Sequence, residues 1–302
     1  MMVNLKNSYP VYSEKKQKAG IIIRPTIWGN TNRFGKIICL IILFCPFAAL
    51  RAQFDAKLSE LGLKGGVKSI VEREYQVENY DYDKQKEVRR VTLEFNPNGC
   101  KTKEEYSSAS GEVSYSGIFG YDESGTLTEE KVNNYGYNKN FVKQYQINDS
   151  KIIVNITYDA GTSELYAKYN LNSKGDITQR IDYDKRGTYR IFKYTYNRAG
   201  LLQSEAQQMP QKTINFQYTY NAQNKVEKKA EVTSSGRILH IQTYTYDSNG
   251  NIASEVSSYA DDPEKLTINY KYVLDSAGNW IEKQEYMNNN LFSVIKREIA
   301  YY

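Results

Sequence analysis

A seven-residue pattern recurs along this chain at intervals of 24 to 28 residues, and it constrains the fold more than any other feature. Each copy begins with an aromatic residue or leucine and has Asp or Asn at its fourth position, and most copies end in Gly or Asn. Tandem repeats of this length indicate that each unit is one supersecondary element. The copies are LEFNPNG (93–99), FGYDESG (119–125), YQINDSK (145–151), YNLNSKG (169–175), YTYNRAG (194–200), YTYNAQN (218–224), YTYDSNG (244–250) and YVLDSAG (272–278).

Each repeat has the signature of a β-hairpin. Before the turn, aromatic or branched residues alternate with polar ones, which is the pattern of a half-buried strand. Asp or Asn starts a turn because its short side chain can bond the backbone two residues on. Gly or Asn at the end suits the positive φ of a type I turn followed by a bulge. The alternation is clearest in Ile214, Phe216, Tyr218 and Tyr220 against Asn215, Gln217 and Thr219.

Hairpins in series predict an all-β fold, an antiparallel β-meander of tandem hairpin repeats. The segment 65–75 is expected to be its first strand, and the sheet would contain about 16 to 18 strands, more than the roughly 10 that stay flat without curling. Because strands twist in a right-handed sense, we expect a twisted strip or partly closed shell. Tyrosines would lie inside, Lys, Glu and Thr outside, and a free strand edge at either end could pair with another chain.

The first 52 residues predict export. Arg33 and Lys36 precede an apolar run of 14 residues, 37–50, and Ala52 follows it. The run is shorter than the roughly 20 residues of a membrane-spanning helix, and the order is typical of a secretory signal peptide. An uncleaved anchor and a lipid on Cys45 are alternatives, the second disfavoured by Phe44. The expected organisation is a signal peptide with a long N-terminal region at 1–52, a short segment at 53–66 with a helical turn at 55–63, and one β-repeat domain at 67–302.

Charge and cysteine content limit the function of the mature chain. Removing residues 1–52 takes away eight of the 40 basic residues and one of the 35 acidic ones, which changes the net charge from +5 to −2. The basic footprint expected of a nucleic-acid-binding protein is therefore absent. Cys100 would be the single remaining cysteine, so no intramolecular disulfide could form.

The turn segments carry a family resemblance. The stretches YTYDSNGNIASE (244–255) and YKYVLDSAGNWIEK (270–283) resemble the YD repeat of the RHS family, and the resemblance extends over about 67–302. In that family the repeats form β-strips that spiral into hollow shells, and large members enclose a C-terminal toxin. This chain has only about eight repeats, and its 261–264 segment does not fit the family's DPxG-type boundary. The resemblance therefore implies a short exported scaffold and does not extend to toxin delivery.

The sequence offers little chemistry for catalysis. His240 is the only histidine and is most simply interpreted as a half-buried strand residue on the face of Tyr244, and Cys100 as a small residue at a strand start. No motif for zinc, calcium or phosphate occurs, so we expect no cofactor and no metal. Carboxylates on return strands are harder to dismiss, since a glycosidase needs two acids at a suitable separation. The residues considered are Glu105, Glu130, Glu227, Glu255 and Glu282.

Tyrosines at the first position of four repeats are the candidate ligand-binding residues. They are Tyr194, Tyr218, Tyr244 and Tyr272, which are expected to stack across neighbouring units as a ladder. Tyrosine combines an apolar ring with a hydroxyl, which suits sugar faces and protein interfaces. Most of the ladder is nevertheless expected to form core, because this sheet has little else to bury.

The preferred interpretation is a non-catalytic exported scaffold that binds glycan, cell-envelope material or a protein partner. It would be periplasmic, cell-surface or extracellular, with no membrane span after signal cleavage. An outer-membrane β-barrel is the first alternative, because alternation and a signal peptide fit a spanning sheet too. Against this alternative, Lys228 would share the lipid face with Val226 and Ala230. A lysine facing lipid near the bilayer midplane destabilises a barrel by roughly 2–4 kcal/mol. A carbohydrate-active hydrolase is the second alternative.

Overall fold

The computed structural model describes residues 61–185 and 187–302. All of these residues belong to one compact unit. The predicted signal peptide lies outside the described residues, as does most of the predicted helical turn at 55–63. Within the described residues, no helix is long and apolar enough to cross a bilayer.

The unit is all-β, as the repeat pattern predicted. Two short 3-10 helices, η4 (Glu78–Tyr80) and η5 (Tyr135–Tyr137), interrupt the connections. The strands are β1 (Val67–Val77), β2 (Gln85–Phe95), β3 (Lys101–Ser107), β4 (Val113–Tyr121), β5 (Leu127–Asn134), β6 (Lys139–Ile147), β7 (Lys151–Tyr158), β8 (Ser163–Leu171), β9 (Ile177–Asp184), β10 (Gly187–Tyr196), β11 (Leu202–Met209), β12 (Lys212–Tyr220), β13 (Val226–Val232), β14 (Ile238–Tyr246), β15 (Ile252–Tyr259), β16 (Lys265–Leu274), β17 (Trp280–Met287) and β18 (Asn290–Tyr301).

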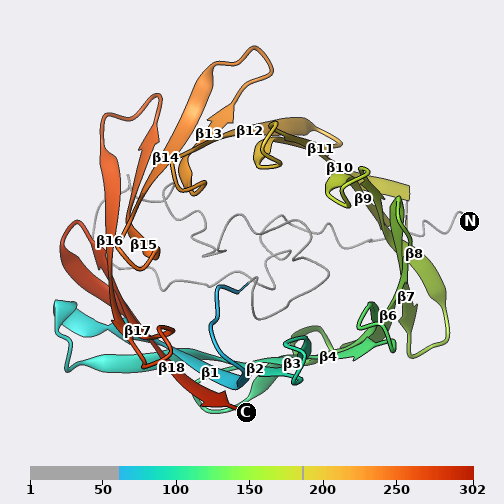
Figure 1. Cartoon of the computed structure of the whole chain (residues 1–302), viewed down its shortest axis with the longest axis horizontal. Helices are drawn as coiled ribbons and strands as arrows, with labels where there is room; N and C mark the ends of the chain where they lie inside the picture. The colour runs from blue at the N-terminus through green and yellow to red at the C-terminus, as the bar shows by residue number, and fades with distance from the viewer. Residues whose placement is uncertain (1–60, 186) are drawn as a thin grey trace, which may run out of the picture. The chain divides into compact units, whose positions relative to one another are not determined.

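The sheet closes into an 18-stranded barrel, so the predicted strip or partly closed shell is wrong. Each strand pairs antiparallel with its neighbours in sequence, and β1 pairs with both β2 and β18. Figure 1 shows β18, β1 and β2 side by side where the ring of strands closes. Closure has a physical reason: an edge strand leaves a row of backbone donors and acceptors unpaired, and joining β1 to β18 removes both edges. The predicted free edges are therefore absent from the described sheet.

Seven of the eight turns have the geometry that the repeat predicted, and the turn at 148–151 lacks the bulge. In the repeat ending at Gly250, the Asp247 carboxylate accepts hydrogen bonds from the backbone N–H groups of Asn249 and Asn251, at 2.9 and 2.8 Å. Gly250 has a φ of +86°, and Asn224 takes the same place with a φ of +60°. The strand register shifts beside these turns, for example between Thr245 and Tyr246. Each of these turns therefore carries the bulge that a type I turn with a left-handed closing residue produces.

Tyrosines at the third position of the repeat connect adjacent hairpins. Their hydroxyls donate to the carbonyl of the first return-strand residue in the preceding repeat, at 2.6–2.7 Å. In the last repeat Leu274 occupies that position, and Tyr272 donates to the Ile252 carbonyl instead, at 3.0 Å. These bonds give the repeated tyrosine a structural role. The four donor–acceptor pairs are Tyr121–Lys101, Tyr196–Ile177, Tyr220–Leu202 and Tyr246–Val226.

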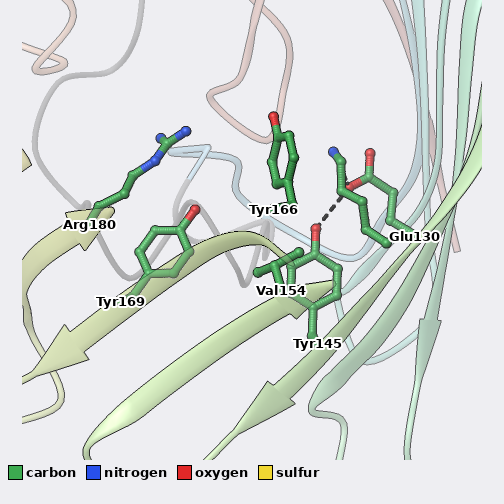
Figure 2. A pocket seen from close by; sticks show the side chains of 7 residues that line it. Glu130, Tyr145, Val154, Tyr166, Tyr169 and Arg180 are labelled. Carbon is green, nitrogen blue, oxygen red and sulfur yellow. Dashed lines mark hydrogen bonds and ion pairs between the residues drawn. The ribbon is translucent and has the colours of Figure 1, made fainter. Parts of the chain in front are cut away.

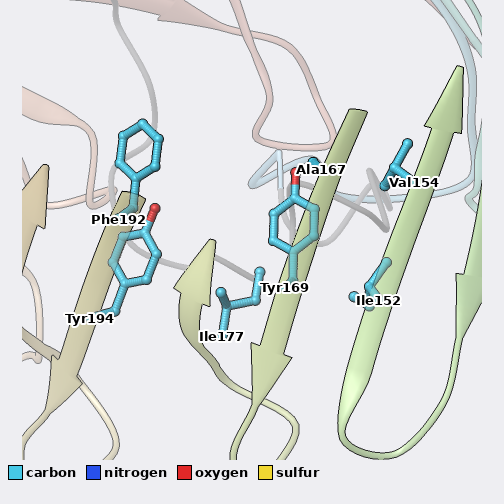
Figure 3. Close-up of a cluster of buried hydrophobic side chains, with 7 residues drawn as sticks. All are labelled: Ile152, Val154, Ala167, Tyr169, Ile177, Phe192 and Tyr194. Carbon is cyan, nitrogen blue, oxygen red and sulfur yellow. The ribbon is translucent and has the colours of Figure 1, made fainter. Parts of the chain in front are cut away.

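The two faces of the barrel wall differ sharply. Pairing of Tyr194 with Glu205 and of Tyr218 with Lys229 places these residues on one face. This is the inner face, because most of the buried strand residues lie on it and the convex side of a single closed sheet has no second layer to cover it. Figure 3 shows a cluster on this face that contains Tyr194. Its members are Ile152, Val154, Ala167, Tyr169, Ile177, Phe192 and Tyr194.

The outer face is mainly polar. Its mid-strand positions carry mostly Thr, Ser, Lys, Glu, Asn and Gln, most of them exposed or half-exposed. Single apolar residues lie between them, among them Ile118, Val142, Ile181, Ile241 and Val256. Lys228 faces outward opposite Thr219, with Ala230 two residues on, as the sequence predicted. Val226 does not share that face: the bulge beside Tyr220 turns it inward. An apolar cluster of Val77, Leu291 and Val294 is confined to β1, β18 and their loops. Exposed outward residues elsewhere include Lys168, Lys193, Gln217, Thr243 and Lys271.

Candidate functional site

A charged residue occupies the same inner position in seven of the eight repeats. It lies five residues after the last residue of the turn, directly across from the first residue of the repeat. Glu130 and Glu255 are each 5% exposed and Lys283 is 4% exposed. We call this set the inner belt. Its members are Glu104, Glu130, Arg180, Glu205, Lys229, Glu255 and Lys283.

The four predicted tyrosines all face the belt. Tyr194 and Tyr218 are buried, at 7% and 8% exposure, whereas Tyr244 and Tyr272 are half-buried. They lie on alternate strands, β10, β12, β14 and β16, and the strand after each carries a belt residue directly opposite the ring. The arrangement is therefore an alternation of rings and charges rather than an uninterrupted stack of rings.

The inner tyrosines and belt residues interact in two ways. Cationic members lie over aromatic rings: the Arg180 guanidinium is 5.7 Å from the Tyr169 ring centre, and the Lys229 ammonium is 4.3 Å from that of Phe216. Anionic members accept hydrogen bonds from phenols, as when Tyr218 donates to Glu205 at 3.0 Å. Burial, reinforced by the Glu205 charge, raises the pKa of Tyr218. This phenol therefore stays a neutral hydrogen-bond donor.

Glu130 is held by three side-chain donors. Its carboxylate accepts hydrogen bonds from the Tyr115 hydroxyl at 2.8 Å, the Tyr145 hydroxyl at 2.9 Å and the Lys143 ammonium at 2.8 Å. Burial by itself raises the pKa of Glu130, but the Lys143 charge and these three hydrogen bonds outweigh burial and lower it. Glu130 is therefore a buried carboxylate that stays ionised.

Arg180 holds a second ion pair in the same region. Its Nε and Nη2 donate to the two carboxylate oxygens of Asp182, at 2.6 and 3.2 Å. Burial by itself lowers the pKa of Arg180, but nearby Tyr169 and Asp182 outweigh burial and raise it. The side chain is thus a fixed cation, and no described residue accepts a hydrogen bond from its Nη1.

A hollow of about 160 Å³ opens in the inner wall between these two ion pairs. In the third repeat, the residue opposite Tyr145 is Val154 of β7, at the place where the other repeats carry a belt residue. Figure 2 shows Tyr145, Tyr166 and Tyr169 around the hollow, with Arg180 on one side and Glu130 on the other. A bulge between β7 and β8 leaves Tyr166 as an extra residue. The lining residues are Glu130, Lys143, Tyr145, Val154, Tyr166, Tyr169 and Arg180.

A second acidic region surrounds Glu255 on β15. Gln242 donates to its carboxylate at 2.8 Å. Burial, reinforced by the charge of Glu285, raises the pKa of Glu255 despite hydrogen bonds that lower it. Glu285 itself pairs with Lys283 at 3.0 Å. Glu130 and Glu255 therefore differ in their electrostatic settings although they occupy the same repeat position.

The five carboxylates considered for hydrolysis are not brought together. Glu130 and Glu255 are inner residues, but on β5 and β15, which lie far apart in the strand order of the ring. Glu105 and Glu282 face outward opposite Ser116 and Lys296. The fifth, Glu227, is exposed in the bulge of β13. A two-acid glycosidase site cannot be assembled from this set.

His240 and Cys100 have the settings expected of structural residues. His240 is half-buried on the inner face and stacks on Tyr259, with ring centres 4.2 Å apart. Burial and the Lys229 charge lower the pKa of His240, and its Nε2 has no hydrogen-bond partner among the described residues. Cys100 is buried at the start of the return strand. No cluster of three or more metal-ligating side chains occurs in the described part of the chain.

Sequence reasoning missed the belt, although a signal was present. Aligning the repeats on the turn rather than on the tyrosines shows a charged residue five positions after each closing Gly or Asn. Lysines and glutamates were expected on the outer face, and Glu130 and Glu255 were considered only as separate carboxylates. The sequence carried no such signal for the hollow. The turn at 148–151 is shorter than the other repeat turns, so Val154 does not stand five residues after the last turn residue.

Comparisons with known proteins establish no family. No family model matches the chain, and no curated protein matches it. A porin-like protein from Bacteroides uniformis is 17% identical, with 78% of this chain and 99% of that chain covered and a TM-score of 0.46. A porin-like protein from Bacteroides vulgatus is 10% identical, with coverages of 76% and 97% and a TM-score of 0.27. A Photorhabdus luminescens Tc holotoxin pore is 13% identical over 74% of this chain and 13% of that chain, with a TM-score of 0.35. These likenesses are too weak to assign a function.

Proposed function

We propose that this protein is an exported, non-catalytic β-barrel of the cell envelope that binds a hydrophilic ligand against its inner wall. The observation that carries the proposal is the inner belt: in seven repeats a charged residue faces the barrel interior beside tyrosines or other rings. Buried charges are unfavourable unless they are paired, and a structural core would be built more simply from apolar residues. Rings alternating with charged and hydroxyl groups suit glycans, whose faces are apolar and whose edges are polar.

The closed barrel also strengthens the outer-membrane alternative. Bacterial outer-membrane barrels have an even number of antiparallel strands and no edge, and this barrel has 18 closed strands. The composition of the outer face favours water over lipid. A spanning barrel needs an outward apolar band about 25 Å tall, whereas Lys193, Gln217 and Lys271 occupy exposed outward positions within their strands. We therefore propose a water-soluble barrel and keep the outer-membrane pore as the second candidate.

Cysteine labelling tests the proposed placement. Thr243 is exposed on the outer face of β14, and Ser257 is half-buried on the inner face of β15. We expect Thr243→Cys to react fully with a sulfonated, membrane-impermeant maleimide in detergent-free buffer and after incubation with lipid vesicles. Cys100→Ala serves as the background, although native Cys100 is buried. A protein that needs detergent to stay in solution, inserts into vesicles and loses labelling at Thr243→Cys would be a membrane barrel.

The same pair of variants tests binding. A glycan panel is screened with the purified chain, and the labelling rate of Ser257→Cys is measured with and without each binder. Ligand bound at the inner wall beside β15 slows labelling at Ser257→Cys and leaves Thr243→Cys unchanged. Equal protection of both variants would show that the inner wall is not the binding surface, and glycan binding without protection of Ser257→Cys would exclude the inner wall at β15 alone.

A further inference from the structure

We infer that the hollow at Val154 is a subsite for an acidic sugar residue of an oligosaccharide; this inference rests on the proposed inner-wall binding and names its ligand class. The hollow exists because one repeat breaks the belt. Opposite Tyr145, the place of a long charged side chain is taken by Val154, which is 2% exposed. The space of about 160 Å³ lies beside this short side chain, where the neighbouring repeats carry the longer Glu130 and Arg180.

The size of the hollow suits a single sugar ring. A cavity of about 150 Å³ can hold one benzene ring, so a hollow of about 160 Å³ has the scale of a single six-membered ring. Val154 provides an apolar floor, and Tyr169 is buried at 5% exposure beside it. Tyr166 is 38% exposed and stands at the bulge of β8. Bulges commonly redirect a side chain next to a functional site, and this one places a second ring against the hollow.

The charges of the hollow favour an anionic ligand. Its lining contains two cations, Lys143 and Arg180, and one carboxylate, Glu130. The phenols stay neutral, since burial raises the pKa of Tyr145 and Tyr169. The net charge of the lining side chains is therefore +1, which one carboxylate on the ligand would neutralise.

The donors of the hollow exceed its acceptors. Lys143 uses one of its three N–H groups on Glu130. Arg180 directs Nε and Nη2 toward Asp182, which leaves Nη1 for a ligand. The oxygens of Glu130 already accept three hydrogen bonds. A hexuronate supplies what is missing, because its carboxylate is an acceptor for Arg180 and Lys143 while its ring packs on tyrosine.

Calorimetry with matched oligosaccharides tests the inference. The probes are a galacturonic acid tetramer and the uncharged galactose tetramer, titrated into the full chain. We expect the acidic tetramer to bind at least tenfold more tightly. Lys143→Gln should abolish this preference by weakening acidic binding about tenfold while leaving the uncharged probe unaffected.

Tyr166→Ala tests the ring contact without disturbing a buried residue. It should weaken binding of the acidic tetramer about tenfold, whereas Tyr135→Ala, a tyrosine 57% exposed in η5, should leave it unchanged. Equal affinity for the two tetramers, or unchanged binding in Tyr166→Ala, overturns the acidic subsite. Glycan protection of Ser257→Cys would still support the proposed function in that case. Absence of binding by every glycan in the panel would contradict the function itself.

Discussion

At the scale of single residues, Glu130 and Glu255 show how one repeat position can support opposite electrostatics. Both are 5% exposed, so burial raises the pKa of each. Glu130 has the Lys143 ammonium and two phenols as donors, and its pKa falls below the ordinary value. Glu255 has uncharged donors and the nearby charge of Glu285, and its pKa rises. The partner cation, rather than burial, decides the direction.

Glu130→Gln is expected to destabilise the barrel at neutral pH by roughly 1–3 kcal/mol, because charge-assisted hydrogen bonds from buried donors are lost. A lowered pKa contributes stability that is present above the unfolded-state value and is lost as pH falls through the folded-state value. The difference in free energy of unfolding between the variant and the wild type should therefore shrink toward acidic pH. Urea unfolding at a series of pH values measures this difference. A difference that grows on acidification would contradict the ionised state of Glu130.

Glu255→Gln is expected to behave in the opposite way. A raised pKa means that the protonated form is favoured in the folded chain, so stability is lost as pH rises through the folded-state value. The uncharged amide removes that loss, and the variant should be more stable than the wild type at neutral pH. The advantage should disappear at acidic pH. The same urea series checks it, and a Glu255→Gln variant less stable than wild type at neutral pH would refute the assignment.

At the scale of the hairpin, the tyrosine hydroxyl is a connector between repeats. Tyr246 donates to the Val226 carbonyl at 2.7 Å. Tyr246→Phe removes this hydrogen bond and should lower the free energy of unfolding by about 0.5–1.5 kcal/mol. Tyr135→Phe is the matched control, because Tyr135 is 57% exposed. Equal stability of the two variants in urea would mean that the connector contributes nothing.

The closing residue of the turn gives a second test at this scale. Gly200 has a φ of +81° and open space around its Cβ position, so Gly200→Ala adds backbone strain alone. A left-handed residue with a Cβ is destabilised by roughly 1–2 kcal/mol. Asn224 already adopts a φ of +60° in the equivalent place, and Asn224→Gly should be neutral or slightly stabilising. Thermal unfolding of both variants checks the pair, and a neutral Gly200→Ala would contradict the turn geometry.

The hairpins were predictable because their determinants are local. Asp247, Gly250 and the alternating strand residues lie within one short window, and turn chemistry fixes the bulge. The direction of Val226 was not predictable from alternation, since the bulge beside Tyr220 shifts the register by one residue. The belt was visible in the sequence but was assigned to solvated strands, because alternation alone does not separate an inner charge from an outer one.

At the scale of the whole molecule, closure depends on contacts between residues more than 200 positions apart, which a repeat pattern does not encode. Where β1 meets β18, Arg297 pairs with Glu72 on the inner face at 2.9 Å, and the Arg297 guanidinium lies 3.3 Å from the Trp280 ring centre. On the outer side Arg73 pairs with Glu298. Repeats set the number of strands, but these nonrepeating residues decide whether the first and last strands meet.

Removing β18 should convert the closed barrel into a self-associating sheet. Deleting residues 290–302 leaves β1 and β17 with unpaired backbone groups along one side, and exposed edges recruit further strands. Light scattering after size exclusion should show that the truncated chain associates in a concentration-dependent way. The full chain, whose described strands leave no free edge, should not associate in this way. Deleting Tyr302 alone is the control, since it removes the hydroxyl contact to the Phe95 carbonyl and keeps the β1–β18 ladder. A truncated chain that keeps its β-sheet circular-dichroism spectrum and stays monomeric would show that β1–β18 pairing is not what prevents edge association.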